Sequence, residues 1–369
     1  MDPRIVKQAQ VLMGYSLDVR PGQRVLLQGA PATLPLLKEC YRAALALGAY
    51  PKVLMQLPEI AALMLGSGSE DQIRYVHEIE KAAFATFDAY LNVMGGTNTR
   101  HMSGVPAQRL RLGNQAGAQL QEMFYQRMAR GEISLAITLH PTEAFAQEAG
   151  MSLEEYESFV YRAGHIDDSD PAEYWRSVHR SQEAVCRFLE TRHTLRIMAP
   201  GTDLTMSVAG RKWVNCSGRV NFPDGEVFTG PLEDSAEGTI RFSFPGIYNG
   251  REIEDICLAF ERGRVVQATA AKGQDLLQQL LDTDPGARVV GEIAVGTNPG
   301  IDRFTRNMLF DEKIGGTVHL ALGRALPESR GVNVSAIHWD MLCDMRNGGQ
   351  IYADGKSIYQ HGSFIDPLV

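Results

Sequence analysis

The hydrophobic pattern at the start of the chain predicts helices and short strands in alternation. Apolar residues recur at helical spacing in the segment 3–19, and the segment 21–30 then begins with a Pro-Gly turn and continues as a short apolar run. A helical pattern follows in 31–47 and ends at Gly48, before another short apolar run at 52–57. This order of strand, helix and strand is typical of a parallel α/β unit.

Two further apolar runs, at 87–96 and 133–141, are each followed by a turn and a helical pattern. The segment 167–193 reads as one more helix, which would join two halves of the protein. We therefore predict an α/β N-terminal domain with a parallel sheet over residues 1–190.

From residue 194 the pattern changes to short runs of β-forming residues between Gly, Pro, Asn and Asp turns. Within this half only the segment 272–284 has a clear helical pattern. We predict a β-rich α+β C-terminal domain over residues 191–369, and its candidate residues, described below, make it the catalytic, metal-binding domain.

Composition narrows the class of protein. Apolar residues make up 44% of the chain and charged residues 22%, as in folded globular proteins. The net charge of −8 and the pI of about 5.7 argue against a nucleic-acid-binding protein. Five scattered cysteines without CxxC spacing argue against a disulfide framework and against a cysteine zinc site.

The sequence carries no apolar leader and no run of 18 apolar residues, so we expect a cytoplasmic protein without a membrane span. It also lacks the glycine-rich signatures of dinucleotide-binding and P-loop proteins, as well as HExxH and GxSxG.

A histidine and an aspartate stand two residues apart in the apolar run 333–341. In a strand His338 and Asp340 share a face, while Trp339 and its neighbours point the other way. A buried charge needs a partner or a metal. His319 lies in another apolar run with small neighbours, and two histidines with one carboxylate suffice to hold a divalent metal.

Three glutamates in the same half are further candidates, and each has a structural alternative. Glu226 follows a Pro-Asp-Gly turn and could be a solvated strand end. Glu292 lies inside an apolar strand and could form a buried ion pair with an arginine. Glu312 stands in an Asp-Glu-Lys run that local sequence alone would place in a surface loop. Four carboxylates and two histidines together would suit two hard or borderline divalent ions.

The β-rich half resembles the M29 family of metallo-aminopeptidases, the group of aminopeptidases T and S. The resemblance rests on an ordered set of motifs and extends to the N-terminal half through SLDVRPGQRVLL. The C-terminal motifs are GTDLTMSVAGRKW, NFPDGEVFTGP, EGTIRFSFPG, GEIAVGTNPGI, LFDEKIGGTVHLALG and NVSAIHWDM.

The resemblance implies an α/β N-terminal domain, a C-terminal domain with two divalent ions such as zinc, cobalt or manganese, and a homodimer that acts on peptides with a free N-terminus. It implies the metal ligands Glu226, Glu292, Glu312, His319, His338 and Asp340, with Glu292 as the bridge. Many family members carry a tyrosine shortly after the histidine motif, where this chain has Leu326. Tyr352 or Tyr359 could take its place in space.

The leading hypothesis is a dinuclear aminopeptidase in which a metal-bridging hydroxide attacks the N-terminal peptide bond. Glu226 and Glu292 are candidates for the proton shuttle, and Arg324 for oxyanion stabilisation or, alternatively, a surface salt bridge. A second hypothesis is a single-iron(II) non-haem ring-cleaving dioxygenase, since His319, His338 and Asp340 form a two-histidine, one-carboxylate set. A third is a non-catalytic protein with a structural or vestigial metal.

Overall fold

The computed structural model describes residues 2–248 and 250–365, and these divide into two compact units. The first unit comprises the chain up to Ala172 together with Gly218–Pro223, and the second comprises Glu173–Ser217 and the chain from Asp224 onward. The units therefore separate at the start of the long helix α9 (Pro171–Leu189), about where the sequence placed a joining helix. The boundary at residue 190 stays a prediction, because compact packing does not by itself define independently folding domains.

The first unit is built around a parallel five-stranded sheet with the order β2-β1-β3-β4-β8. Its strands are β1 (Arg24–Gly29), β2 (Tyr50–Met55), β3 (Ala89–Met94), β4 (Ser134–Leu139) and β8 (Asn221–Phe222). Its helices are α1 (Pro3–Val11) with a π-helical turn (Leu12–Ser16), a 3₁₀ turn (Pro31–Thr33), α2 (Leu34–Ala46), α3 (Pro58–Ser67), α4 (Glu70–Arg74), α5 (Glu78–Thr86), α6 (Ala107–Ala129), α7 (Glu143–Glu148) and α8 (Leu153–Ala163).

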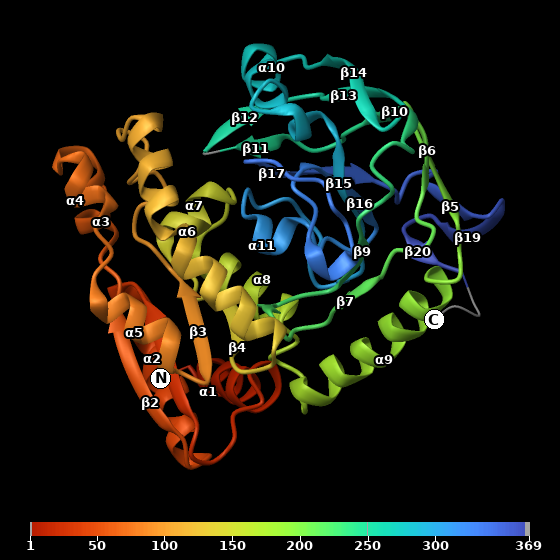
Figure 1. Cartoon of the computed structure of the whole chain (residues 1–369). Helices are drawn as coiled ribbons and strands as arrows, with labels where there is room; N and C mark the ends of the chain where they lie inside the picture. Colours follow the sequence, from red (N-terminus) through yellow and green to blue (C-terminus); the bar gives the residue numbers. More distant parts are fainter. Residues whose placement is uncertain (1, 249, 366–369) are drawn as a thin grey trace. The chain divides into compact units, whose positions relative to one another are not determined.

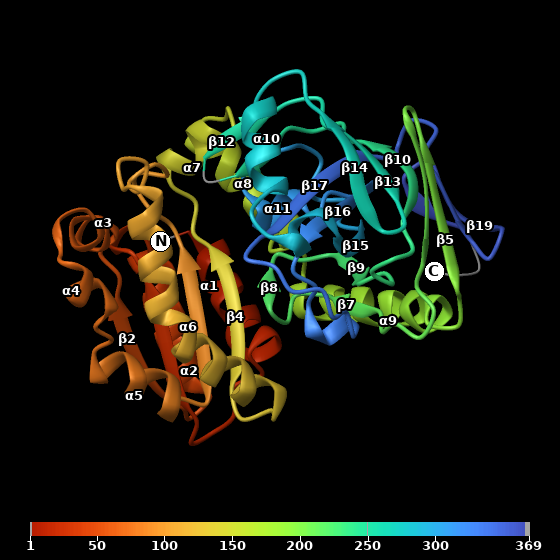
Figure 2. The ribbon, with the colours of Figure 1, turned by 45° about the horizontal axis from the view of Figure 1, so that its top comes forward.

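Both faces of this sheet are covered, which explains its continuous apolar runs. Val25, Leu26 and Leu27 are consecutive in β1, and all three are buried. In Figure 2, α6 runs along the strands. The ring of Phe124 in α6 packs edge-to-face on the ring of Tyr90 in β3. The α/β unit with a parallel sheet was predicted from sequence, and that prediction is confirmed.

The second unit is β-rich, as predicted, and contains an eight-stranded sheet, a five-stranded sheet and a two-stranded ribbon (Figure 1). The eight-stranded sheet, in its spatial order, consists of β14 (Arg264–Thr269), β13 (Cys257–Glu261), β10 (Glu237–Arg241), β6 (Thr202–Ser207), β5 (Thr194–Ala199), β18 (Gln350–Ala353), β19 (Lys356–Gln360) and β20 (Ser363–Phe364). The five-stranded sheet consists of β17 (His338–Asp344), β16 (Thr317–Gly323), β15 (Val290–Gly296), β9 (Glu226–Thr229) and β7 (Val214–Cys216). The remaining elements are the ribbon β11 (Gly246–Tyr248) and β12 (Arg251–Ile253), the helices α10 (Gln274–Leu281) and α11 (Met308–Asp311), and 3₁₀ turns at Pro285–Arg288 and Pro327–Ser329.

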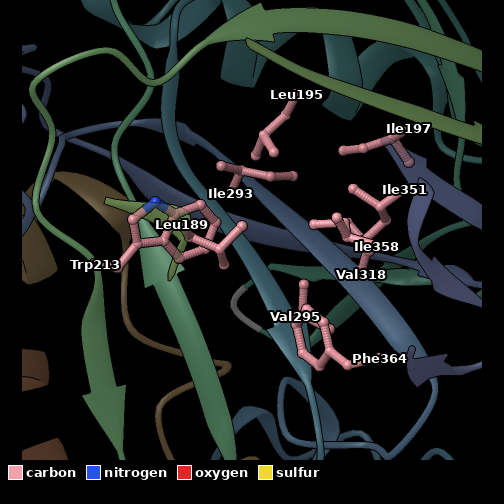
Figure 3. A pocket seen from close by; sticks show the side chains of 10 residues that line it. All are labelled: Leu189, Leu195, Ile197, Trp213, Ile293, Val295, Val318, Ile351, Ile358 and Phe364. Atoms are coloured by element: carbon pink, nitrogen blue, oxygen red, sulfur yellow. The ribbon is translucent and has the colours of Figure 1, made fainter. Parts of the chain in front are cut away.

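The core of the second unit lies between its two large sheets. Ile293, Val295 and Val318 of the five-stranded sheet meet Leu195, Ile197, Ile351 and Ile358 of the eight-stranded sheet in Figure 3. The apolar packing leaves a cavity of only about 10 Å³. Because side chains alternate along a strand, the residues next to these core residues emerge on the opposite face of the five-stranded sheet.

Candidate metal centre

The opposite face of the five-stranded sheet carries the polar residues that the sequence singled out. Glu226 is the first residue of β9, Glu292 lies in β15, His319 lies in β16, and β17 begins with His338 and continues to Asp340. The antiparallel register places Glu226 beside Gly296, His319 beside Ala294, and both Glu292 and Asp340 beside Ala321. The shared face predicted for His338 and Asp340 is therefore part of a larger polar face.

Small residues form the floor of this polar face. Along β15 the residues that share the face are Glu292, Ala294 and Gly296, and along β16 they are His319, Ala321 and Gly323. Each of the five candidate ligands on the strands therefore stands beside an alanine or a glycine on one neighbouring strand. This leaves space above the sheet into which the longer side chains converge.

The converging side chains form two overlapping groups. His319 Nε2 lies 3.3 Å from both Glu226 Oε2 and Glu292 Oε1. His338 Nε2 lies 3.6 Å from Glu292 Oε2 and 3.6 Å from Asp340 Oδ1. One group is thus Glu226, Glu292 and His319, the other is Glu292, His338 and Asp340, and within each the potential ligand atoms lie within 4.8 Å of one another. Glu292 is common to both.

Glu312 reaches the same place from a loop. It follows α11, and one of its oxygens falls into a group with His319 and Asp340. Gly296 allows the loop to approach, because a Cβ at that position would lie 2.3 Å from the carbonyl oxygen of Ile314 and 3.1 Å from that of Glu312. The six ligands implied by the family resemblance are therefore close together in the structure.

The structural alternatives considered for the three glutamates do not describe their surroundings. Glu226 is buried, so it is not a solvated strand end. Within residues 2–248 and 250–365, Glu292 lies beside two histidines, His319 and His338, and forms no ion pair with an arginine. The Asp-Glu-Lys run is not a surface loop, since Asp311 and Lys313 are both buried.

Three further residues lie at the edge of the centre and were not predicted from the sequence. The Lys313 ammonium contacts Glu226 Oε1, lies 2.7 Å from Glu312 Oε1 and lies 3.7 Å from Asp224 Oδ1. Cys216 forms a group with Asp224 and Glu226. Local sequence gave one signal for Asp224, its place in the Pro-Asp-Gly turn, whereas Lys313 looked like part of a solvated charge run.

The turn before Glu226 is fixed by close packing. Gly225 has φ +125°, and a Cβ there would lie 2.8 Å from the Cβ of Asn298. Asn298 in turn donates its side-chain N–H to the carbonyl oxygen of Asp224 at 2.7 Å. Gln182 of α9 donates to the carbonyl oxygen of Glu226 at 3.0 Å. These contacts fix the main chain at Glu226 and so the position from which its side chain extends.

Burial and mutual charge shift the pKa values of the centre. Burial raises the pKa of Glu292, against the opposing effect of the hydrogen bond from His319. Burial opposes the charged form of His319, but the hydrogen bond to Glu292 and the field of Glu226 outweigh it and raise the pKa to about 9. For His338 burial is likewise outweighed, by Asp340 and Glu292, and the pKa rises to about 10. Without metal, both side chains are therefore positively charged imidazolium groups at neutral pH.

The main chain of Arg324 orients His338. His338 Nδ1–H donates to the Arg324 carbonyl oxygen at 2.7 Å, which directs Nε2 toward Glu292 and Asp340. The guanidinium of Arg324 is exposed and donates to the Ser335 carbonyl oxygen at 3.3 Å. The two tyrosines suggested as replacements for the family tyrosine have partners outside the centre. Tyr352 donates to Gln350, and Tyr359 packs on Phe364.

The donor set fits divalent metal ions. Glu226 Oε2, Glu292 Oε2 and Asp340 Oδ1 are buried, and within 2–248 and 250–365 they have no hydrogen-bond partner. Buried carboxylate oxygens normally have such a partner or bind a cation. Carboxylates with imidazoles suit zinc, cobalt and manganese. The fold and the site together place the protein in the class of metal-dependent enzymes.

Comparison with known proteins gives the family. The family model described as thermophilic metalloprotease (M29) matches residues 1–364, so the chain belongs to the M29 family. Aminopeptidase T of Thermus thermophilus is 29% identical, over 97% of this chain and 95% of the relative. Aminopeptidase T of Thermus aquaticus is 31% identical, over 68% of this chain and 69% of the relative.

A solved structure agrees with the fold. Wild-type AmpT from Thermus thermophilus superimposes with a TM-score of 0.86 at 26% identity and covers 98% of this chain and 99% of its own. The predicted fold class and the predicted enzyme class, a metallo-aminopeptidase among the hydrolases, are confirmed by these comparisons. Among the described residues, no helix has the length and hydrophobicity needed to span a bilayer.

Proposed function

We propose that the protein is a dinuclear aminopeptidase that cleaves N-terminal peptide bonds with a metal-bridging hydroxide. The observation that carries the proposal is the position of Glu292 between two donor groups, one with Glu226 and His319 and the other with His338 and Asp340. A carboxylate shared in this way is what a pair of ions about 3.5–4 Å apart requires.

The proposed ligands divide between the two ions. Glu226 and His319 would hold the first, His338 and Asp340 the second, and Glu292 would bridge them. Glu312 lies between the groups, because it is near both His319 and Asp340. The donors are oxygen and nitrogen atoms, which supports zinc, cobalt or manganese.

Bound ions would polarise the substrate carbonyl and lower the pKa of a shared water toward about 7, giving hydroxide at neutral pH. The chain's own residues then have to move a proton to the leaving amine. Glu226 and Glu292 stay the two candidate bases and neither is preferred, because Glu292 would bridge the ions and one oxygen of Glu226 contacts Lys313. The Arg324 guanidinium is proposed to stabilise the developing oxyanion, since it is exposed at the end of the strand that carries His319.

The substrate follows from the same proposal. The relatives are named aminopeptidases, and a pair of ions can bind the free amine of a peptide while polarising the adjacent carbonyl. We expect a peptide with a free N-terminus. The single-iron dioxygenase alternative would use only His319, His338 and Asp340, and it finds no support among the named relatives.

We further propose a cytoplasmic homodimer. Helix α3 of the first unit has an almost wholly apolar sequence but no buried residue, and it exposes Ile60, Leu63 and Met64. Exposed apolar side chains clustered in this way commonly mark a protein interface. Sedimentation analysis tests this, and a monomer at micromolar concentration would contradict it.

The deciding experiment is metal content per chain together with amide hydrolysis. Protein purified without chelator would be analysed for metals and then titrated with zinc, cobalt, manganese and iron(II), and chromogenic leucine and arginine amides would be assayed in parallel. Two equivalents with hydrolysis support the proposal. One tightly bound iron without hydrolysis overturns it and directs the search to oxygen consumption with aromatic substrates.

A further inference from the structure

A lysine side chain is buried inside the carboxylate cluster. Lys313 is 1% exposed, and its ammonium contacts Glu226 Oε1, Glu312 Oε1 at 2.7 Å and Asp224 Oδ1 at 3.7 Å. Such complete burial of a charge is costly unless opposite charges surround it. In the proposed peptidase reaction this residue is neither a metal ligand nor a proton donor or acceptor.

The ammonium occupies a third cation position in the cluster. Cys216, Asp224 and Glu226 bring ligand atoms within 4.8 Å of one another, as the two proposed metal groups do. Cys216 is the register partner of Glu226 across β7 and β9. Lys313 contacts two of the three residues in this group, Asp224 and Glu226.

Lys313 also divides the two oxygens of Glu226 between two cations. Oε1 contacts the ammonium, whereas Oε2 lies 3.3 Å from His319 Nε2 within the first metal group. The main chain holds the lysine in place, because its N–H donates to Phe310 and its carbonyl accepts from Asn298, whose side chain binds the turn before Glu226. Glu226 can therefore offer only one oxygen to a metal.

Charge balance supports the same role. The cluster contains the carboxylates of Asp224, Glu226, Glu292, Glu312 and Asp340. Before the shared water loses its proton, two divalent ions would supply four positive charges and leave one carboxylate uncompensated. The lysine ammonium is the missing positive charge, and it is supplied by the chain itself.

We propose that Lys313 is a positioning residue that acts as a built-in third cation of the centre and restricts Glu226 to a single metal-facing oxygen. This inference rests on the proposed metal centre. It makes a specific demand: shortening the lysine side chain should open a third ion site with Cys216 as a sulfur ligand.

The test compares metal stoichiometry in full-length wild-type protein and Lys313→Ala. We expect one more bound cadmium ion per chain in the variant, with an ultraviolet thiolate-to-metal charge-transfer band that wild type lacks. The double variant Lys313→Ala, Cys216→Ser should lose both the extra ion and the band. Lys272→Ala, which removes an exposed lysine paired with Glu254 at 2.6 Å, is the matched control and should behave as wild type.

A second variant keeps the test decisive if Lys313→Ala does not fold. Lys313→Met fills most of the same space with an unbranched, uncharged side chain, so Glu226 becomes free to bind with both oxygens. In the cobalt-substituted protein the coordination number should rise, and the visible absorption should weaken. Unchanged stoichiometry in Lys313→Ala, or an unchanged cobalt spectrum in Lys313→Met, would overturn the inference. Fewer than two ions in wild type would instead overturn the proposed function, since the inference is read from the difference between variant and wild type.

Discussion

Replacing Glu292 with glutamine tests whether one carboxylate serves both metal groups. The substitution keeps the shape of the side chain and removes its charge. Glu292 Oε1 faces His319 and Oε2 faces His338 at 3.3 and 3.6 Å, so we expect both ions to be weakened together. Asp340→Asn, by contrast, changes a proposed ligand of the second ion only, 3.6 Å from His338, and should weaken mainly that ion.

The expected magnitude follows from the linkage between binding and stability. An ion present at 100 times its Kd stabilises the folded state by about 2.7 kcal/mol. Two such ions would contribute roughly 5 kcal/mol, which Glu292→Gln should remove, whereas Asp340→Asn should remove about half. An unfolding entropy of about 2.1 cal/mol/K per residue gives about 1.3 °C for each kcal/mol in a chain of 369 residues. Glu292→Gln should therefore abolish a metal-dependent rise in Tm of roughly 7 °C, and Asp340→Asn should reduce it by roughly 3–4 °C.

The assay is thermal unfolding with and without metal, combined with calorimetric titration of metal-free protein. Glu254→Gln, which alters an exposed glutamate paired with Lys272, is the control and should leave the metal-dependent shift unchanged. If Glu292→Gln kept one ion with wild-type affinity, Glu292 would not be shared, and the dinuclear arrangement argued from its position would be wrong.

Three further predictions concern the protons, the floor and the oxyanion. Metal loading at pH 7 should release about three protons: two from His319 and His338, whose pKa values lie near 9 and 10, and one from Glu312, whose pKa burial raises to about 8. Calorimetry in buffers of different ionisation enthalpy measures the number. In the metal-free protein, the protonated His319 and His338 contribute stability that is fully present below the ordinary histidine pKa of 6.5 and is lost as pH rises through about 9–10. Urea unfolding across this pH range gives a second check. Ala321→Val should lower metal affinity at least tenfold, because Ala321 lies between Glu292 and Asp340. Overpacking should also cost about 1–3 kcal/mol of stability, measured by urea unfolding. Wild-type metal affinity in this variant would contradict the idea that small residues leave room for the ligands. Arg324→Ala should leave metal affinity unchanged, because His338 contacts only the main-chain carbonyl, and should lower kcat by roughly 10²-fold; an unchanged kcat would remove the guanidinium from the mechanism.

Much of the centre could be predicted from sequence because strands impose a simple geometric rule. Alternation alone placed His338 and Asp340 on one face, and it placed His319 with small neighbours. Which strands pair, and in which register, is not a local property. The meeting of β17, β16, β15 and β9 therefore had to come from the family resemblance, and the structure then supplied the register that places Glu292 and Asp340 beside Ala321.

The residues that escaped prediction depend on contacts between distant parts of the chain. Lys313 looked solvated in its charge run, and only the approach of the loop to Glu226 makes it a buried cation. The strand β8 also could not be foreseen. It consists of two residues, and it extends the sheet of the first unit by pairing with β4, more than 80 positions earlier in the chain. Local pattern carries no information about such a return.

The same short pattern occurs on two neighbouring strands and accounts for the shape of the site. β15 carries Glu-x-Ala-x-Gly from Glu292, and β16 carries His-x-Ala-x-Gly from His319. Because the strands are antiparallel, each ligand stands beside the alanine of the other strand rather than beside the other ligand. The two ligands therefore meet diagonally above small residues, which gives the ligand atoms room to converge. The intervening apolar residues, such as Ile293 and Leu320, face the core and fix the register, since a slip by one residue would place the ligands in the core. The stability of the fold and the geometry of the site thus depend on the same alternation.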